Sequence, residues 1–156
     1  MRFNDNQLAS FDILSRRFVE EFRRRFVIED ISETITSRPE IHIPAASKAV
    51  GNLVVYLDGD EVTVEVVELY HRHFSFWEYG SALNDESIIP VVEEALEFIR
   101  QVMADKIVFR LFFRDGRIAG ATAGQNPTIA IVDGPSGLSG LPFRDFRWSG
   151  PLEGRQ

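Results

Sequence analysis

Two Asp-Gly dipeptides, each between β-rich arms, constrain the fold of this 156-residue chain more than any other feature. The first lies in LVVYLDGDEVTVEV, around Asp58-Gly59, and the second in IVFRLFFRDGRIAGATAG, around Asp115-Gly116. Asp-Gly supplies the positive φ angles that a type I′ hairpin turn requires. The sequence therefore predicts two antiparallel hairpins with these dipeptides at their turns.

The second arm of the first hairpin alternates with the period of a strand. Val62, Val64 and Val66 would point to one face, with a threonine and a glutamate between them on the other. The phase slips at Val66-Val67, which predicts a bulge or bend there. The chain then reaches YHRHFSFWEY, which either continues this strand or forms a further hairpin arm.

Two longer segments have the three-and-four spacing of amphipathic helices. The first covers residues 5–26, and the second covers residues 86–104. Pro90 fits only in the first turn of the second helix, where its missing N–H does no harm. The apolar stripes are Leu8, Phe11, Leu14, Phe18, Phe22 and Phe26 in the first helix, and Ile88, Val92, Ala95, Leu96, Ile99, Val102 and Met103 in the second.

The remaining segments are shorter and less regular. Residues 27–36 and 128–133 each predict a strand. Pro39 and Pro44 favour a loop or a sheet edge just before the first hairpin. Residues 134–156 are rich in glycine and proline, and we expect an extended tail there.

The order of these elements indicates an α+β fold. Hairpins dominate and no βαβ period is present, so we expect a single antiparallel sheet of about five to seven strands. The two amphipathic helices would pack on one face of that sheet. The whole chain, residues 1–156, is expected to form one domain, which is the usual outcome at this length.

Composition excludes several kinds of chemistry and favours the cytoplasm. The chain has no cysteine, so disulfides, thiolate metal sites and cysteine nucleophiles are absent. The first residues do not have the basic and apolar regions of a signal peptide. No apolar run approaches the roughly 20 residues that cross a bilayer. We therefore expect a cytoplasmic protein that does not bind membranes.

Acidic residues are concentrated in the middle of the chain. The net charge is −7, but residues 58–97 hold eleven acidic residues and one basic residue. Such a segment either keeps the protein soluble or attracts a basic protein partner, because opposite charges speed encounter and help to reject wrong partners. Our candidates for partner contact are Asp58, Asp60, Glu61, Glu65 and Glu68, with Trp77 as an aromatic anchor.

His71 and His73 stand one residue apart, so on a strand both imidazoles would point to the same face. A metal site would need a third ligand, and the approach of the remaining histidine, His42, does not follow from the sequence. The other interpretation is a partly buried pair that bonds to the backbone or to nearby carboxylates. We include His71 and His73 among the partner-contact candidates and assign no metal, no cofactor and no catalytic residue.

Two motifs mix basic and aromatic residues, as proteins that bind single-stranded nucleic acid do. They are FRRRF in the first predicted helix and FRDFRW in the tail. The first helix is charge-balanced and the chain is acidic, whereas nucleic-acid-binding domains have a clear basic face. We therefore expect no nucleic-acid partner.

Three stretches together resemble small bacterial proteins of the polymorphic-toxin immunity type. They are EVTVEVVELYHRHFSFWEYG with its H-x-H-F sequence, the helix-to-hairpin segment ALEFIRQVMADKIVFRLFFRDGR, and the closing FRWSGPL. The resemblance covers about residues 50–150. It implies a non-enzymatic protein that blocks a toxin by covering it. It carries over no catalytic role, and it matches His71, His73, Phe74 and Trp148-Ser149-Gly150.

Three functions remain open at this point. The first is a binding protein that neutralises a basic toxin domain through its acidic middle segment. The second is a dimeric binder similar to secretion chaperones, although those proteins usually end in a helix. The third is an enzyme that uses His71 and His73, with or without a metal ion. The oligomeric state does not follow from the sequence, and a dimer is possible.

Overall fold

A computed structural model describes residues 1–66, 69–125 and 137–152 of the chain. Its elements form an α+β fold with antiparallel strands, as the sequence predicts. The elements are α1 (Asp5–Ser10), α2 (Ile13–Arg25), β1 (Ser32–Ile35), β2 (Pro39–Ile43), β3 (Leu53–Leu57), β4 (Glu61–Val66), β5 (Tyr70–Ser75), the 3₁₀ turn η1 (Phe76–Glu78), α3 (Asp85–Met103), β6 (Val108–Arg114), β7 (Arg117–Gly124), β8 (Phe143–Arg147) and β9 (Gly150–Pro151).

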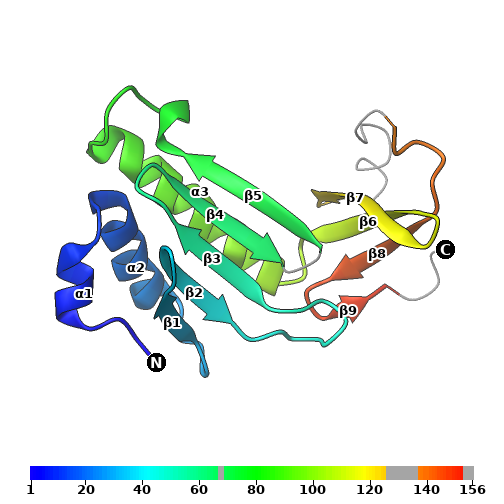
Figure 1. Ribbon diagram of the computed structural model, residues 1–156, viewed down its shortest axis with the longest axis horizontal. Coiled ribbons are helices and arrows are strands. Elements are labelled where there is room, and N and C mark those ends of the chain that lie inside the picture. Colours follow the sequence, from blue (N-terminus) through cyan, green and yellow to red (C-terminus); the bar gives the residue numbers. More distant parts are fainter. Residues whose placement is uncertain (67–68, 126–136, 153–156) are drawn as a thin grey trace.

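The strands form two sheets instead of the single sheet that we expected. The first is a meander in the order β1-β2-β3-β4-β5, and α3 crosses behind it (Figure 1). The second has the order β7-β6-β8-β9 and lies at the other end of the molecule's long axis (Figure 1). The chain changes sheets because α3 carries it from β5 to β6. Side chains from both sheets nevertheless belong to one buried cluster with the helices.

Both predicted hairpins form, but only one of them has the predicted turn. Asp115 and Gly116 have φ angles of 51° and 74°, as a type I′ turn requires. The β3–β4 turn is closed by hydrogen bonds between Asp58 and Glu61, of 3.0 and 3.3 Å. Gly59, in that turn, does not have a positive φ. The Asp-Gly pair therefore predicts the hairpin correctly here and its turn geometry wrongly.

The first predicted helix is divided in two. Asp12 begins α2 as its N-cap, because its Oδ1 accepts a hydrogen bond of 2.8 Å from the Ser15 N–H. Asn4 caps α1 in the same way and forms a capping box with Gln7. Phe11 lies between the helices and is buried against Phe3, with ring centroids 4.9 Å apart. The apolar spacing continues through the break because Phe11 still points into the core.

The segment that contains Pro39 and Pro44 corrects our expectation of a loop or a sheet edge. It forms β2, an interior strand that pairs with both β1 and β3. Pro39 is the first residue of β2, and Pro44 follows its last residue, so both prolines lie at positions that a strand tolerates. The predicted strand over residues 27–36 is reduced to β1.

The second predicted helix is confirmed as α3, but Pro90 is not in its first turn. The helix begins at Asp85, after a capping box between Asn84 and Ser87. Pro90 is therefore the sixth helical residue, and the carbonyl of Glu86 has no N–H donor four residues along. Because Glu86 is exposed, water can bond to that carbonyl instead.

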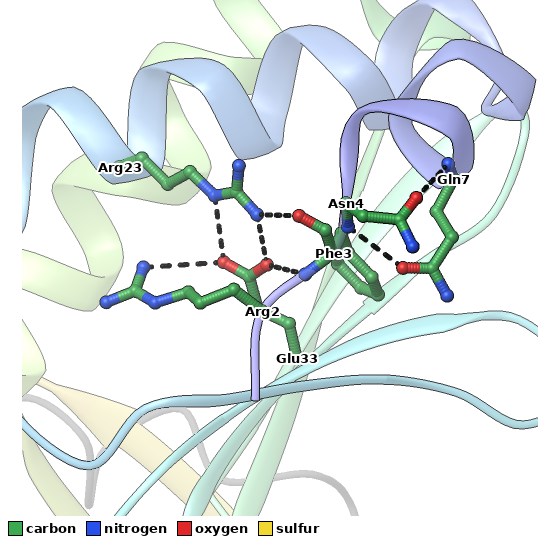
Figure 2. A network of polar contacts seen from close by, with 6 residues as sticks. All are labelled: Arg2, Phe3, Asn4, Gln7, Arg23 and Glu33. Carbon is green, nitrogen blue, oxygen red and sulfur yellow. Dashed lines mark hydrogen bonds and ion pairs between the residues drawn. The ribbon is translucent and has the colours of Figure 1, made fainter.

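Figure 2 shows how the N-terminal segment is attached to the helices and the first sheet. The Glu33 carboxylate on β1 is buried and accepts a hydrogen bond of 2.6 Å from the Phe3 N–H. It also forms ion pairs with Arg23 of α2 and with Arg2. The Glu33 N–H donates to the Met1 carbonyl at 2.9 Å. One carboxylate thus joins β1, α2 and the chain terminus.

A second buried ion pair lies within the second sheet. Arg110 on β6 donates two hydrogen bonds, each of 2.7 Å, to the carboxylate of Asp145 on β8. Both residues are 2% exposed, and the guanidinium lies 3.8 Å from the ring centroid of Phe143. The sequence left open whether the C-terminal tail docks on its own domain. This pair and the β6–β8 ladder hold residues 143–147 in the sheet.

Some expectations fall on parts of the chain that the structure does not describe. The strand predicted for residues 128–133 lies outside the described residues, as do Val67 of the predicted bulge and the contact candidate Glu68. The first six residues of YHRHFSFWEY form a hairpin arm, because β5 pairs antiparallel with β4, and Phe76–Glu78 form η1. Within the described part of the chain, no helix combines the length and the apolar character needed to cross a membrane.

Candidate protein-interaction face

One face of the five-stranded sheet is covered by helices, and the other face is polar. Val62, Val64 and Val66 on β4 are fully buried in the core that α3 shares, so the residues between them point away from α3. Directly opposed residues of antiparallel strands share a face. We call the side away from α3 the polar face; it carries Glu40, His42, Tyr56, Glu61, Thr63, Glu65, His71 and His73.

The strand register arranges most of these side chains in two rows. In the first row, Tyr56 lies opposite Glu40 and Thr63, and Thr63 lies opposite His73. A second row runs parallel to the first and consists of His42, Val54, Glu65 and His71. Residues from β2, β3, β4 and β5 therefore meet on one continuous surface.

His73 makes the best-defined polar contacts of this surface. Its Nδ1 lies 2.8 Å from Oε1 of Glu61 and 3.0 Å from Oγ1 of Thr63. The Thr63 hydroxyl also donates to Glu61, at 3.2 Å. Glu61 thus fixes the orientation of the imidazole, while about half of the His73 side chain, 53%, stays open to solvent.

Tyr56 and Glu65 form a second pair across β3 and β4. The Tyr56 hydroxyl donates a hydrogen bond of 2.8 Å to Oε2 of Glu65. Burial, together with this hydrogen bond to a carboxylate, raises the pKa of Tyr56 to about 12. Tyr56 therefore stays protonated, and neutral, throughout the physiological range.

The third histidine joins the same face from β2. Nε2 of His42 lies 2.9 Å from Oε2 of Glu40, and the Thr36 hydroxyl donates to Glu40 at 2.6 Å. Burial raises the pKa of Glu40, but these two hydrogen bonds outweigh it, so that the pKa lies below its ordinary value. The position of His42 could not be predicted, because β2 was not predicted as a strand.

One arginine lies beside this carboxylate-rich surface. Arg38 donates a hydrogen bond of 2.5 Å to Asp58 in the β3–β4 turn, and its guanidinium covers the Tyr56 ring at 4.3 Å. Arg72, the only basic residue in the acidic segment, points to the other side of the sheet. It lies over the rings of Phe74 and Phe98, at 4.9 and 5.4 Å, and so adds no positive charge to the polar face.

Trp77 lies at one end of the polar face, in η1. Its side chain is 62% exposed, which is unusual for so large an apolar group. The Phe76 N–H bonds to the Asp60 carbonyl at 3.2 Å, so η1 lies against the β3–β4 turn. The Phe76 and Trp77 ring centroids are 4.1 Å apart. The backbone of η1 therefore holds the exposed Trp77 next to that turn.

A groove closes the opposite end of the polar face, where the two sheets meet. Glu65 and His71 lie on its wall beside apolar residues of β4 and β5, and β7 forms the other wall. Its volume is about 470 Å³, and Ile118 on β7 is half exposed at its edge. The full lining is Glu65, Val66, Leu69, Tyr70, His71, Ile118, Gly120 and Ala121.

The structure separates the acidic segment into two surfaces that the sequence did not distinguish. Asp58, Asp60, Glu61 and Glu65 lie on the polar face or in its turn. The acidic residues of α3 belong to the helical side, where Glu93 pairs with Arg25 and Glu97 pairs with Arg100. Among the candidates that the structure describes, Asp58, Asp60, Glu61, His73 and Trp77 gather at the turn end, whereas Glu65 and His71 lie at the groove end.

Within the described residues, the histidine pair does not meet a third metal ligand. The rings of His71 and His73 lie 5.2 Å apart, edge to face. Over residues 1–66, 69–125 and 137–152, no three His, Asp or Glu side chains are grouped closely enough to hold a metal ion. The contacts of His73 agree with the alternative in which the imidazole bonds to a neighbouring carboxylate.

Comparisons of this chain with protein-family models, with curated proteins and with solved structures found no match.

Proposed function

We propose that this protein is a non-enzymatic binding protein and that a basic protein partner docks on its polar face. The observation that carries this proposal is the position of Trp77, which is exposed and follows Phe76, the residue whose N–H attaches η1 to the Asp60 carbonyl of the β3–β4 turn. Aromatic side chains of this kind dominate the affinity of protein interfaces, and surrounding charges set the rate and specificity of encounter. These acidic residues are also separate from those of α3, which supports a single docking surface on this side of the molecule.

The most specific form of the proposal is toxin neutralisation in the cytoplasm. It is supported by the resemblance of residues 50–150 to immunity proteins, and His71 and His73 of that resemblance lie on the polar face. The partner would be a basic toxin domain, which the protein inhibits by covering its surface. No residue of this chain takes a catalytic part in that mechanism.

Capture of the partner from the native host, at low and at high salt, tests the proposal. The tagged protein is compared with an Asp60→Lys/Glu61→Lys variant, and bound proteins are identified by mass spectrometry. We expect a basic protein that binds the wild type, is lost at high salt and is not captured by this variant. Charge screening weakens interactions between exposed groups, so the salt effect reports on electrostatic attraction.

A matched variant separates this surface from net charge. Glu20→Lys/Glu86→Lys changes the charge equally, and both residues are exposed on the helices. We expect it to bind the partner as the wild type does. Trp77→Ser should weaken binding by about tenfold or more without changing the unfolding midpoint. Equal binding by all four proteins would contradict the proposal.

A further inference from the structure

All three histidines of the chain lie on the polar face, and each is next to a glutamate. His73 contacts Glu61, and His42 contacts Glu40, at 2.8 and 2.9 Å. His71 lies directly opposite Glu65 in the β4–β5 ladder. The polar face therefore combines three carboxylates with three imidazoles, and imidazole is the side chain that ordinarily changes charge between pH 5 and 8.

Among the described residues, each of the two histidines on β5 has one carboxylate as its neighbour on β4. The neighbours of His73 are Glu61 and Thr63 on β4, and the ring of His71. His71 faces Glu65 on β4, and on its other side lies the wall of the groove that β7 provides. That wall consists of Ile118, Gly120 and Ala121, which carry no charge.

The surroundings of His42 are similar. Across the ladder it faces Ser32 on β1 and Val54 on β3, which are uncharged. Its charged neighbour on β2 is Glu40, whose pKa is lowered by the hydrogen bonds described above. Beyond Glu40 lies the ion pair of Arg38 and Asp58.

The contacts also define where each proton would bind. Nδ1 of His73 donates to Glu61, so the incoming proton from solvent goes to Nε2. In His42 the roles are reversed, because Nε2 donates to Glu40 and Nδ1 is left to accept the proton. Protonation turns each hydrogen bond between a neutral imidazole and a carboxylate into an ion pair without moving either ring.

We propose that the polar face is a pH-gated docking surface, which binds its basic partner at neutral pH and releases it on mild acidification. This inference rests on the proposed function. The three glutamates give this face three negative charges at pH 7.5, and three imidazolium groups would offset them, so that Asp60 and the Arg38–Asp58 pair at the turn would hold the remaining charge. Glutamates ordinarily stay ionised at pH 5.5, as do the lysines and arginines of a basic partner.

Binding of fluorescein-labelled octalysine, measured by anisotropy at constant ionic strength, tests the inference. We expect the dissociation constant to rise about tenfold or more between pH 7.5 and pH 5.5. A His42→Gln/His71→Gln/His73→Gln variant should bind equally well at both pH values, because glutamine keeps a polar side chain but takes up no proton. Circular dichroism at both pH values checks that each protein stays folded.

The outcomes separate the inference from the proposed function. Tight binding of octalysine with the same affinity at both pH values would overturn pH gating and leave the docking surface in place. A lack of binding at pH 7.5 would contradict the docking surface itself. If the triple variant does not fold, the exposed residue His71 is replaced alone, and His71→Gln should reduce the pH effect. If His71→Gln instead shows as large a pH effect as the wild type, the inference is contradicted.

Discussion

At the scale of single residues, mutation of a buried carboxylate should cost much more stability than mutation of a carboxylate on the surface. Asp145 and Glu33 each accept several hydrogen bonds from arginines or backbone inside the core. The carboxylates of the polar face keep contact with solvent, as the half-exposed pair of Glu61 and His73 illustrates. A buried charge left without its partner is costly, whereas an exposed pair contributes little.

We expect Asp145→Asn to destabilise the protein by about 3–5 kcal/mol, because it leaves the buried Arg110 guanidinium without its counter-charge. Urea unfolding followed by circular dichroism measures the change. Replacing both partners, as Arg110→Met/Asp145→Leu, should restore most of the stability, because no unpaired charge remains. If the double variant is as unstable as Asp145→Asn, the expectation is contradicted, and the ion pair makes a net contribution to stability that apolar side chains do not replace.

Substitution of the two hairpin glycines by alanine compares the two turns directly. Gly116 has a φ of 74°, whereas Gly59 lies outside the positive-φ region, and a Cβ at either position meets open space. Gly116→Ala should therefore lower the free energy of unfolding by about 1 kcal/mol through backbone strain. Gly59→Ala should leave it unchanged or raise it by about 0.4–1 kcal/mol, since alanine restricts the unfolded chain. Equal losses in both variants would contradict the turn assignment.

At the scale of elements, the polar face depends on cross-strand pairs that the sequence predicts only in part. Alternation along β4 correctly placed Thr63 and Glu65 on one side, and the H-x-H spacing did the same for His71 and His73. Whether these two sets share a face depends on the register of β4 against β5. The sequence left open whether residues 70–79 continue the strand or form a further hairpin arm, so this register could not be predicted.

Other elements were missed because one local sequence signal concealed another. Two prolines hid β2, although each lies just at an end of the strand, and His42 was lost with it. Phe11 continued the apolar stripe of the first helix and hid the N-cap at Asp12. An Asp three residues before Ser15, read as a capping signal, would have divided that helix correctly.

The pairing of β3 with β4 predicts a pH dependence in alkali. Tyr56 has an ordinary pKa of 10.0, raised to about 12 in the folded protein. Unfolding therefore releases its proton between these pH values, and the stability that the pair gives is complete below pH 10 and falls as the pH rises to 12. Tyr56→Phe should lose about 1 kcal/mol at pH 8 and flatten this fall in urea titrations.

Tyr79 provides the control for that measurement. Its hydrogen bond to Glu94, with burial, also raises its pKa to about 12, but it lies on the helical side of the molecule. Tyr56→Phe should therefore retain part of the alkaline decline, and Tyr56→Phe/Tyr79→Phe should retain less. A decline that is identical in the wild type and in Tyr56→Phe would contradict the role of the Tyr56–Glu65 pair.

At the scale of the whole molecule, the two sheets share one core. Tyr70 at the start of β5 packs against Phe109 of β6 and Phe98 of α3, with ring centroids 5.9 and 6.3 Å apart. Contacts of this kind couple the unfolding of neighbouring elements, because loss of one sheet exposes the apolar face of the other.

We therefore expect one cooperative unfolding transition. In a Trp77→Phe variant, the remaining tryptophan is Trp148, which is buried beside the second sheet at 5% exposure. Its fluorescence reports on that sheet, and far-ultraviolet circular dichroism reports on the whole chain. The two signals should have the same urea midpoint. Separate midpoints would show that the sheets unfold as independent units.

The separation of the sheets along the long axis also makes the protein an electric dipole. Carboxylates gather on the polar face and in its turn, on the first sheet. Residues 98–156 hold eight basic and five acidic residues, and the second sheet exposes Arg114, Arg117, Arg144 and Arg147. A molecule of this kind is turned by the field of a charged neighbour before it makes contact. A basic surface in solution would thus meet the carboxylate end of this protein first, with the arginine end held away from it.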